Sequence, residues 1–295
     1  MITVECKDVT KSFGRKKEIA LDHVSFQLEA GNIYGLFGRN GAGKTTLMNC
    51  FCTKYLPDNG EIFILGEEAY ENEKVLDEIC FMSDQIDVFE IKTVKSILFY
   101  ASTFYKKWNE ELKEKLLSFF EIKQDKIYGD LSKGQKTIIG ILIGLCSGCE
   151  IVLLDEIYSG LDAAARQNFY EILLEEQEKH PRTFLLSTHL IEEMTGLFTH
   201  VLMMDKGKVI LSEDMETLYS KSFKCVGRAD RAKCLATKNV LLKKEMGTIA
   251  EYALYDTLDI TEKKQLEKEG FTISPLSLQD LFIAFTEDTT KKWGI

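Results

Sequence analysis

Apolar and polar residues alternate in the first part of the chain, over residues 2–6 and again over residues 24–28. Alternation with a period of two is typical of antiparallel strands that have one buried and one solvated face. Residues 33–37, 151–154 and 184–186 are instead almost continuously apolar. Runs of this kind are typical of strands that are covered on both faces. The pattern therefore predicts a core sheet of buried strands with an antiparallel segment beside it.

A helical period replaces the strand patterns in the middle of the chain. Asn109 is placed to cap a helix in which Leu112 and Leu116 recur four residues apart. Ser132 and Gln135 stand three residues apart before another apolar run, which is the capping-box signature of a helix N-terminus. We therefore predict a helical insertion within a framework of alternating strands and helices.

The pattern becomes weaker and more mixed beyond about residue 212. Thr261 is predicted to cap a short charged helix, and residues 271–273 form a strand-like triplet. Ser277 precedes a last apolar run at residues 281–285. The tail is therefore predicted to be a small α+β appendage whose final helix packs by its apolar face.

Composition limits the class of protein. A chain of 295 residues is long enough for one large domain with an appendage, or for two domains. Its 45% hydrophobic and 28% charged residues are typical of an ordinary globular protein. The net charge of −10 argues against a protein that wraps nucleic acid, although a local basic patch stays possible. The longest apolar run, at residues 138–146, is shorter than the ~20 residues that span a bilayer, so we expect any membrane span to come from another chain.

Eight cysteines are scattered through mostly apolar surroundings, and no signal peptide is recognised at the N-terminus. These features favour a reducing compartment such as the cytosol. Cys146 and Cys149 form a CxxC pair, which has two interpretations. A single pair without a second ligand pair is a weak sign of zinc or redox chemistry, and buried small hydrophobic side chains are the favoured alternative.

The most specific chemistry lies in a glycine-rich loop between the predicted strand at residues 33–37 and a predicted helix. Its sequence is Gly38-Arg39-Asn40-Gly41-Ala42-Gly43-Lys44-Thr45. Glycines let backbone N–H groups approach phosphate closely, and the following helix directs its N-terminal dipole at the same anion. Lys44 is then expected to reach the outer phosphates and Thr45 to ligate magnesium. The loop alone predicts a nucleoside triphosphate site.

Other polar residues stand where they can complete this site. Asp155 and Glu156 directly follow a buried strand, at the end of a sheet where ligands of α/β proteins bind. Unpaired burial of two carboxylates is costly, and magnesium near Lys44 would relieve that cost. His189 ends the next such strand and can donate a hydrogen bond to the nucleotide. Phe13 has two equal interpretations, as a ring that stacks on the base or as a core residue.

Taken together, the loop, the sequence Leu131-Ser132-Lys133-Gly134-Gln135, the acidic pair and His189 resemble the nucleotide-binding subunit of an ATP-binding cassette (ABC) transporter. The resemblance spans roughly residues 1–212, and its most specific part is residues 131–135, close to the family signature LSGGQ. It implies a P-loop NTPase core sheet with an antiparallel β subdomain and a helical subdomain at about residues 86–148. Residues 213–295 are then expected to form the accessory α+β domain.

The resemblance also implies roles for individual residues. Gln85 matches a glutamine that touches magnesium and senses the membrane subunit, and Asp155 matches the aspartate that organises magnesium. Glu156 matches the general base for the attacking water, and His189 the switch histidine on the γ-phosphate. The residues implied to contact ATP are Phe13, Gly38, Asn40, Gly41, Ala42, Gly43, Lys44, Thr45, Thr46, Ser132, Gly134 and Gln135; those implied to hold Mg²⁺ are Thr45, Gln85 and Asp155; those implied to act in hydrolysis are Lys44, Gln85, Glu156 and His189.

Two positions depart from the family pattern. Lys133 replaces a glycine of the signature, which changes either the approach of that helix to phosphate or the charge there. Ile157-Tyr158 replaces the usual Pro-Thr between the acidic pair and Ser159-Gly160-Leu161-Asp162, a segment that resembles the D-loop. The second departure bears on the geometry between Glu156 and that loop.

The family resemblance implies partners as well. Two copies of the chain are expected to enclose two ATP molecules, with the loop of one copy facing Ser132 of the other. An integral membrane permease is the second expected partner, which places the chain in the cytoplasm against the inner face of the cell membrane. The tail sequence at residues 277–282 is similar to a subgroup that exports drugs, bacteriocins and antibiotics, so export of drugs, peptides or lipids is expected. The alternatives are a soluble ABC ATPase of ribosomes or DNA, which usually has two cassettes or a long coiled coil, and an ATP-dependent regulatory switch.

Overall fold

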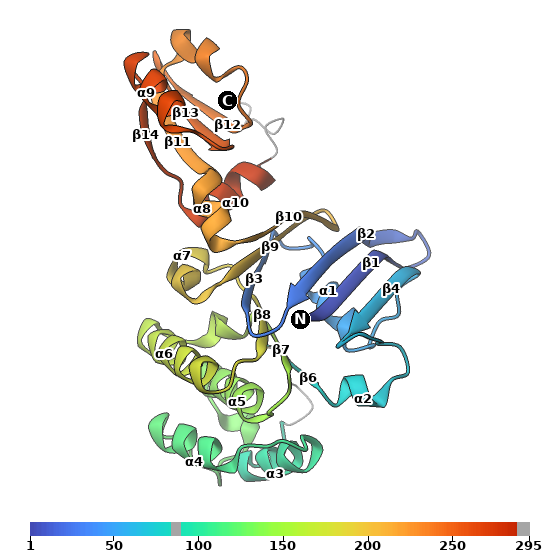
Figure 1. The fold of residues 1–295 in the computed structure, drawn as a ribbon. Coiled ribbons are helices and arrows are strands. Elements are labelled where there is room, and N and C mark those ends of the chain that lie inside the picture. The colour runs from blue at the N-terminus through green and yellow to red at the C-terminus, as the bar shows by residue number, and fades with distance from the viewer. Residues whose placement is uncertain (84–89, 288–295) are drawn as a thin grey trace.

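The computed structural model describes residues 1–83 and 90–287, and three β-sheets with surrounding helices make up this part of the chain (Figure 1). The predicted site residue Gln85 lies outside the described residues. The expected α/β fold class is confirmed, because a largely parallel central sheet stands beside an antiparallel one.

The first sheet is antiparallel, with the strand order β2-β1-β4-β5. Val4 and Cys6 of β1 are buried while Glu5 between them is more exposed, as the alternating sequence predicts. Cys6 of β1 lies opposite Phe26 of β2, so that both apolar faces point to the same core. The strands are β1 (Ile2–Phe13), β2 (Glu18–Glu29), β4 (Asn59–Ile64) and β5 (Glu67–Glu68).

The central sheet has six strands in the order β10-β9-β3-β8-β7-β6. All pairings are parallel except that of the edge strand β10. Every residue of β7 and β8 is buried, as predicted from their unbroken apolar sequences. Because the strands run in parallel, the ends of β3, β7 and β8 meet at one edge of the sheet. The strands are β3 (Ile33–Gly38), β6 (Ile79–Ser83), β7 (Ile151–Asp155), β8 (Thr183–Ser187), β9 (His200–Asp205) and β10 (Lys208–Asp214).

The predicted helical insertion forms the end of the molecule farthest from the C-terminal sheet (Figure 1). Asn109 accepts a hydrogen bond from the backbone N–H of Leu112, and Ser132 forms a capping box with Gln135, so both predicted caps are confirmed. The helices of this insertion are α3 (Val94–Phe104), α4 (Glu110–Phe119) and α5 (Lys133–Cys146). The remaining helices around the central sheet are α1 (Lys44–Phe51), α2 (Glu73–Leu76), α6 (Ala163–Lys179) and α7 (Ile191–Met194).

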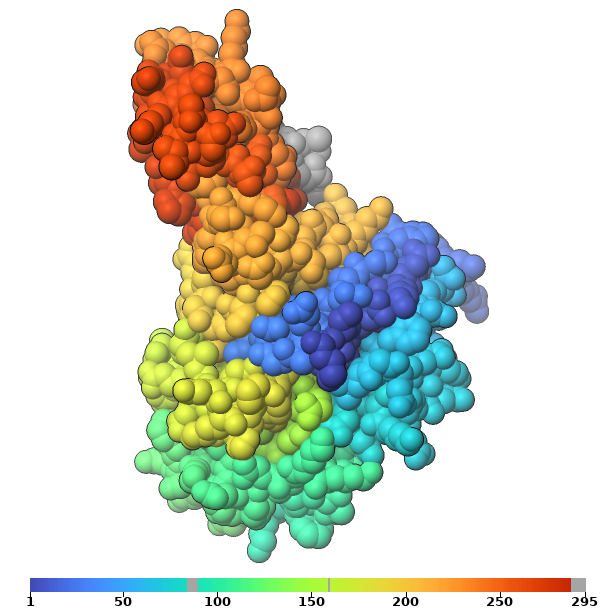
Figure 2. All heavy atoms as spheres, in the orientation of Figure 1, coloured from blue at the N-terminus to red at the C-terminus, as the bar shows by residue number. Residues whose placement is uncertain are grey.

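The C-terminal unit, residues 215–286, forms a lobe above the central sheet (Figure 2). Its antiparallel sheet has the order β12-β13-β11-β14 and a core of its own that includes Phe223, Leu254 and Phe271. The elements are α8 (Met215–Lys221), β11 (Ser222–Arg228), β12 (Val240–Met246), β13 (Ile249–Tyr255), α9 (Ile260–Lys268), β14 (Thr272–Pro275) and α10 (Leu278–Thr286).

The predicted cap of α9 is wrong by two residues. Asp259, and not Thr261, occupies the N-cap position, and its carboxylate accepts a hydrogen bond of 2.7 Å from the N–H of Glu262. Glu262 in turn accepts one from the N–H of Asp259. This reciprocal pair satisfies two backbone donors at once, which a cap at Thr261 does not offer.

The last helix, α10, packs on the central sheet as well as on the C-terminal sheet. Its residues Leu278, Leu281 and Ala284 are buried in the same apolar cluster as Ile33 of β3 and Met194 of α7. The final helix therefore packs by its apolar face, as predicted, and it joins the two parts of the molecule.

The CxxC cysteines are buried and form no disulfide. Burial raises the pKa of the Cys149 thiol to about 12, so that this side chain stays neutral. Within residues 1–83 and 90–287, no group of three or more His, Cys, Asp or Glu side chains is arranged to hold a metal ion. These observations support the interpretation of the pair as buried hydrophobic residues.

In the same described ranges, none of the helices is both long enough and apolar enough to cross a lipid bilayer.

Leu281→Ala is expected to lower the free energy of unfolding by about 2–5 kcal/mol, because Leu281 is 0% exposed and its truncation leaves a cavity. Urea denaturation measures this change. Ile260→Ala is the control, because Ile260 is 74% exposed and its loss costs little. Equal effects of the two substitutions would contradict the buried position of α10.

Candidate functional site

The glycine-rich loop connects β3 to α1 at the edge of the central sheet where parallel strands end. Gly43 has a φ of 105°, in the left-handed region that disfavours other residues. A Cβ atom at Gly43 would lie 2.5 Å from the carbonyl oxygen of Ala20, and one at Gly38 would lie 2.8 Å from that of Met204. The loop thus lies directly against its neighbours, and this explains two of its glycines.

This loop surrounds a cavity of about 340 Å³. Lys44 is 8% exposed, and its Nζ donates a hydrogen bond of 2.7 Å to the carbonyl oxygen of Gly38. The backbone amides of such a loop, a lysine and the N-terminus of α1 together fit the phosphates of a nucleotide. The cavity is lined by Ala20, Asn40, Gly41, Ala42, Gly43, Lys44, Thr45, Thr46 and Glu156.

Asp155 is a buried carboxylate, only 5% exposed, at the end of β7. Both of its oxygens accept hydrogen bonds from hydroxyls, Oδ2 from Thr45 at 2.6 Å and Oδ1 from Ser187 at 2.7 Å. A hydroxyl beside a carboxylate is a donor set that suits Mg²⁺, which usually takes one or two carboxylates and the phosphates of the nucleotide. The residues therefore fit a magnesium ion next to the phosphate loop.

Glu156 lies between a lysine and a histidine. Its Oε2 is 2.7 Å from Nδ1 of His189, and its Oε1 is 3.8 Å from Nζ of Lys44. Its backbone has a φ of 53°, an uncommon value for a residue other than glycine, and its N–H donates to the carbonyl oxygen of Ser187. The side chain is 27% exposed, so water can reach this carboxylate. The arrangement suits a base that accepts a proton from water.

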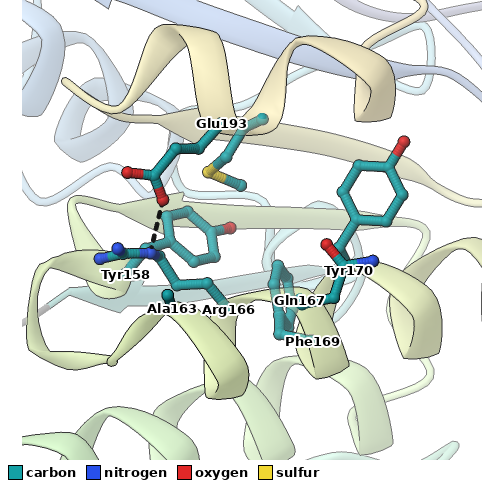
Figure 3. A pocket seen from close by; sticks show the side chains of 8 residues that line it. Tyr158, Ala163, Arg166, Gln167, Phe169, Tyr170 and Glu193 are labelled. Atoms are coloured by element: carbon teal, nitrogen blue, oxygen red, sulfur yellow. Dashed lines mark ion pairs between the residues drawn. The ribbon is translucent and has the colours of Figure 1, made fainter.

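The segments that follow Glu156 and His189 are tied together (Figure 3). Nε of Arg166, on α6, is 2.8 Å from Oε2 of Glu193 on α7, and its Nη1 donates to the carbonyl oxygen of Leu161. Arg166 and Glu193 line a pocket of about 350 Å³ together with Tyr158, and the ring of Tyr158 packs on that of Phe169 with 5.0 Å between the ring centroids. The replacement Tyr158 is therefore a core residue that supports the turn after Glu156.

Among the residues that the structure describes, some of the predicted site residues do not line the phosphate-loop cavity, including Phe13, Ser132 and Gly134. The ring of Phe13 packs edge-on against Tyr55 at 5.1 Å and is 38% exposed. Ser132 is exposed at the N-terminus of α5. A Cβ atom at Gly134 would lie 3.0 Å from the carbonyl oxygen of Gly160, so the start of α5 packs closely on the turn that follows Glu156.

The structure adds two residues to the site that the sequence does not predict. Ser187 holds Asp155, and Ala20 lines the cavity. The sequence shows hydroxyls after the apolar run at residues 184–186, but their role depends on the pairing of Ser187 with Asp155 across β7 and β8. Ala20 approaches the loop only through the tertiary fold.

A family model described as ABC transporter matches residues 21–159. An uncharacterized ABC transporter ATP-binding protein of Methanocaldococcus jannaschii is 33% identical over 226 residues, 74% of this chain and 80% of that protein. The ABC transporter ATP-binding protein YtrB of Bacillus subtilis is 25% identical over 95% of this chain and 97% of its own length. The methionine import ATP-binding protein MetN of Chlamydia pneumoniae is 30% identical over 74% of this chain and 67% of its own length.

Solved structures share the fold. One, described as the ATP binding subunit of an ABC transporter, is 23% identical with a TM-score of 0.65 and covers 73% of this chain and 91% of its own. Another is a dimeric ATP-binding cassette in a post-hydrolysis state bound to ADP and Pi. It is 20% identical with a TM-score of 0.64 and covers 72% of this chain and 98% of its own.

Gly43→Ala is expected to lower the free energy of unfolding more than Gly66→Ala does. Both glycines have a positive φ, which costs alanine about 1–2 kcal/mol, but only the Cβ at Gly43 meets a backbone oxygen, whereas Gly66 has nothing within 4 Å. Urea denaturation of both variants measures the difference. Equal losses would contradict the close approach of the loop to Ala20.

Proposed function

The chain belongs to the family of ABC transporter ATP-binding proteins, and we propose that it binds and hydrolyses ATP to drive a separate membrane permease. The observation that carries the hydrolytic step is the position of Glu156. Its carboxylate lies between His189 and Lys44, and Glu156 lines the phosphate-loop cavity. Phosphoryl transfer needs mainly positioning and charge stabilisation, and this arrangement supplies both.

The phosphate loop binds the triphosphate in this proposal. Lys44 exchanges the carbonyl oxygen of Gly38 for phosphate oxygens, and the loop amides hold the remaining charge. Thr45 and Asp155 hold Mg²⁺, which neutralises charge on the phosphates when it is bound. Phe13 is proposed to offer its exposed ring to the base, which requires it to leave its edge-on contact with Tyr55.

Glu156 accepts the proton of the attacking water, and His189 orients the carboxylate and contacts the γ-phosphate. The 2.7 Å contact between the two side chains supports this pairing, because it fixes one carboxylate oxygen and leaves the other toward the cavity. We also assign a hydrolytic role to Gln85 on the family resemblance alone, since it lies outside the described residues.

The site is completed by a second copy of the chain. Ser132, Gly134 and Gln135 lie at the N-terminus of α5, where Ser132 is exposed, and they are not among the residues that line the chain's own phosphate-loop cavity. An N-terminus of this kind can offer amides and a positive dipole end to the γ-phosphate held by a partner. Lys133, exposed beside it, adds positive charge there. The exposed N-terminus of α5 supports the proposal of a homodimer that encloses two ATP molecules.

An apolar groove is the proposed contact with the permease. It has a volume of about 700 Å³ and lies between α3, the end of β6 and α5. Tyr100 and Phe104 of α3 are 51% and 68% exposed, and both rings line this groove. Contiguous exposed apolar surface of this kind is typical of an interaction site. A short cytoplasmic helix of an integral membrane protein fits such a groove. In this proposal the chain lies in the cytoplasm, against the inner face of the cell membrane.

Domain organisation and direction of transport are also proposals. We divide the chain into an ATPase domain at residues 1–212 and an accessory domain at residues 213–295, and the separate sheet and core of the C-terminal unit support this division. Export is supported only by the tail sequence at residues 277–282, while one similar protein, MetN, is named for methionine import. Identification of a permease that co-purifies from membranes tests the direction and substrate.

Glu156→Gln is expected to slow ATP hydrolysis by roughly 100-fold or more, because an amide cannot accept the proton of water. ATP binding is retained, and the dimer persists in the presence of ATP. Phosphate release and light scattering measure the two effects. Glu192→Gln is the control, because Glu192 is an exposed carboxylate on α7. Unchanged ATP turnover in Glu156→Gln would contradict the proposal that Glu156 is the general base.

Combined Tyr100→Ser and Phe104→Ser substitutions are expected to reduce recovery of the integral membrane partner in pull-downs from membranes. Hydrolysis by the isolated chain should stay close to that of the wild type, because neither ring lines the phosphate-loop cavity. Phe119→Ser on α4 is the matched control, since Phe119 is 55% exposed outside the groove. Full recovery with the double variant would rule out this groove as the contact.

A further inference from the structure

A hydrogen bond connects the phosphate loop to the last helix of the C-terminal unit. Nε of Arg39 donates to Oγ1 of Thr286 at 3.2 Å, across 247 positions of the sequence. Arg39 is the second residue of the loop, and Thr286 is the last residue of α10. The contact therefore joins the nucleotide site to a part of the chain that the ATPase core does not include.

The end of α10 is suited to hold an arginine. The hydroxyl of Thr286 donates to the carbonyl oxygen of Phe282 at 2.8 Å, which leaves its lone pairs free to accept from Arg39. The last turn of α10 contains no basic residue of its own. A cation is favoured near the C-terminal end of a helix, and Arg39 supplies that charge from outside the helix.

α10 is itself firmly placed. Thr286 is 7% exposed, and Leu281 and Ala284 are buried in the main apolar cluster. The helix contacts β3, which leads into the phosphate loop, and α7, which follows His189. It thus packs on the elements that carry both sides of the proposed ATP site.

Arg39 is also tied to the shape of the loop. Its carbonyl oxygen accepts a hydrogen bond of 3.0 Å from the N–H of Ala42, and the carbonyl of the preceding Gly38 accepts one from Lys44. Arg39 is exposed, and its bond to Thr286 is the contact by which α10 can restrain the turn that presents Lys44 and the amides to phosphate.

We propose that α10 positions the phosphate loop through the bond between Arg39 and Thr286, so that the C-terminal unit raises the affinity of the loop for ATP. Arg39 and Thr286 act as positioning residues in this proposal. It rests on the proposed function, because it assumes that the loop binds ATP. The position of the C-terminal unit then changes the affinity of the site for ATP, and a displacement of α10 weakens ATP binding.

Thr286→Val tests the proposal, because it removes the hydroxyl and keeps a similar shape. The Kd for a non-hydrolysable ATP analogue with Mg²⁺, measured by calorimetry on the full chain, is expected to rise roughly 2- to 10-fold, the range for one lost hydrogen bond. Thr286→Ser restores the hydroxyl and is expected to bind like the wild type. In an Arg39→Met background, Thr286→Val is expected to add no further loss.

Thr261→Val is the matched control, because Thr261 is an exposed threonine on α9 of the same unit. An unchanged Kd in Thr286→Val, or an equal loss in Thr286→Ser, would overturn the inference. A wild-type chain that binds no ATP analogue would instead overturn the proposed function and this inference with it. Thermal unfolding checks that Thr286→Val is folded; if it is not, Arg39→Met breaks the same bond from the loop and must show the same rise in Kd.

Discussion

The burial of one carboxylate constrains the architecture of the site. Asp155 ends a strand that is covered on both faces, and a buried charge is costly unless it is hydrogen-bonded. Its two partners come from different segments, Thr45 from the start of α1 and Ser187 from the end of β8. Asp155 therefore has both hydrogen bonds only when two conditions hold together. β7 and β8 must pair in this register, and the phosphate loop must hold Thr45 beside the carboxylate.

The neighbouring carboxylate has a different environment, and so a different use. Asp155 is saturated by two hydroxyls, whereas Glu156 turns out of the sheet through a left-handed backbone conformation and stays partly exposed. The backbone bond from Glu156 to Ser187 and the ion pair between Arg166 and Glu193 brace this turn. One strand end thus presents a carboxylate held by two hydroxyls and, one residue later, a carboxylate that water can reach.

Most of the fold was predictable because its signals are local. Buried strands appear as unbroken apolar runs, and the cap at Ser132 appears as a pair three residues apart. The start of α9 was predicted at the wrong residue because both Asp259 and Thr261 can cap a helix, and the choice depends on where Glu262 reaches. The roles of Ser187 and Thr286 are not predictable from local sequence. Ser187 meets Asp155 through the register of the sheet, and Thr286 meets Arg39 through the packing of α10.

The place of α10 in the main core has a consequence for biosynthesis. In chain order this helix follows every strand described, yet its side chains complete the apolar cluster around β3 and α7. During translation, residues 1–212 leave the ribosome before α10 has been synthesised. The part of the apolar cluster that residues 278–286 cover is then still exposed to solvent. The apolar cluster around β3 is therefore completed only after the C-terminal sheet has been synthesised, and a nascent chain that ends before α10 leaves part of this cluster exposed to solvent.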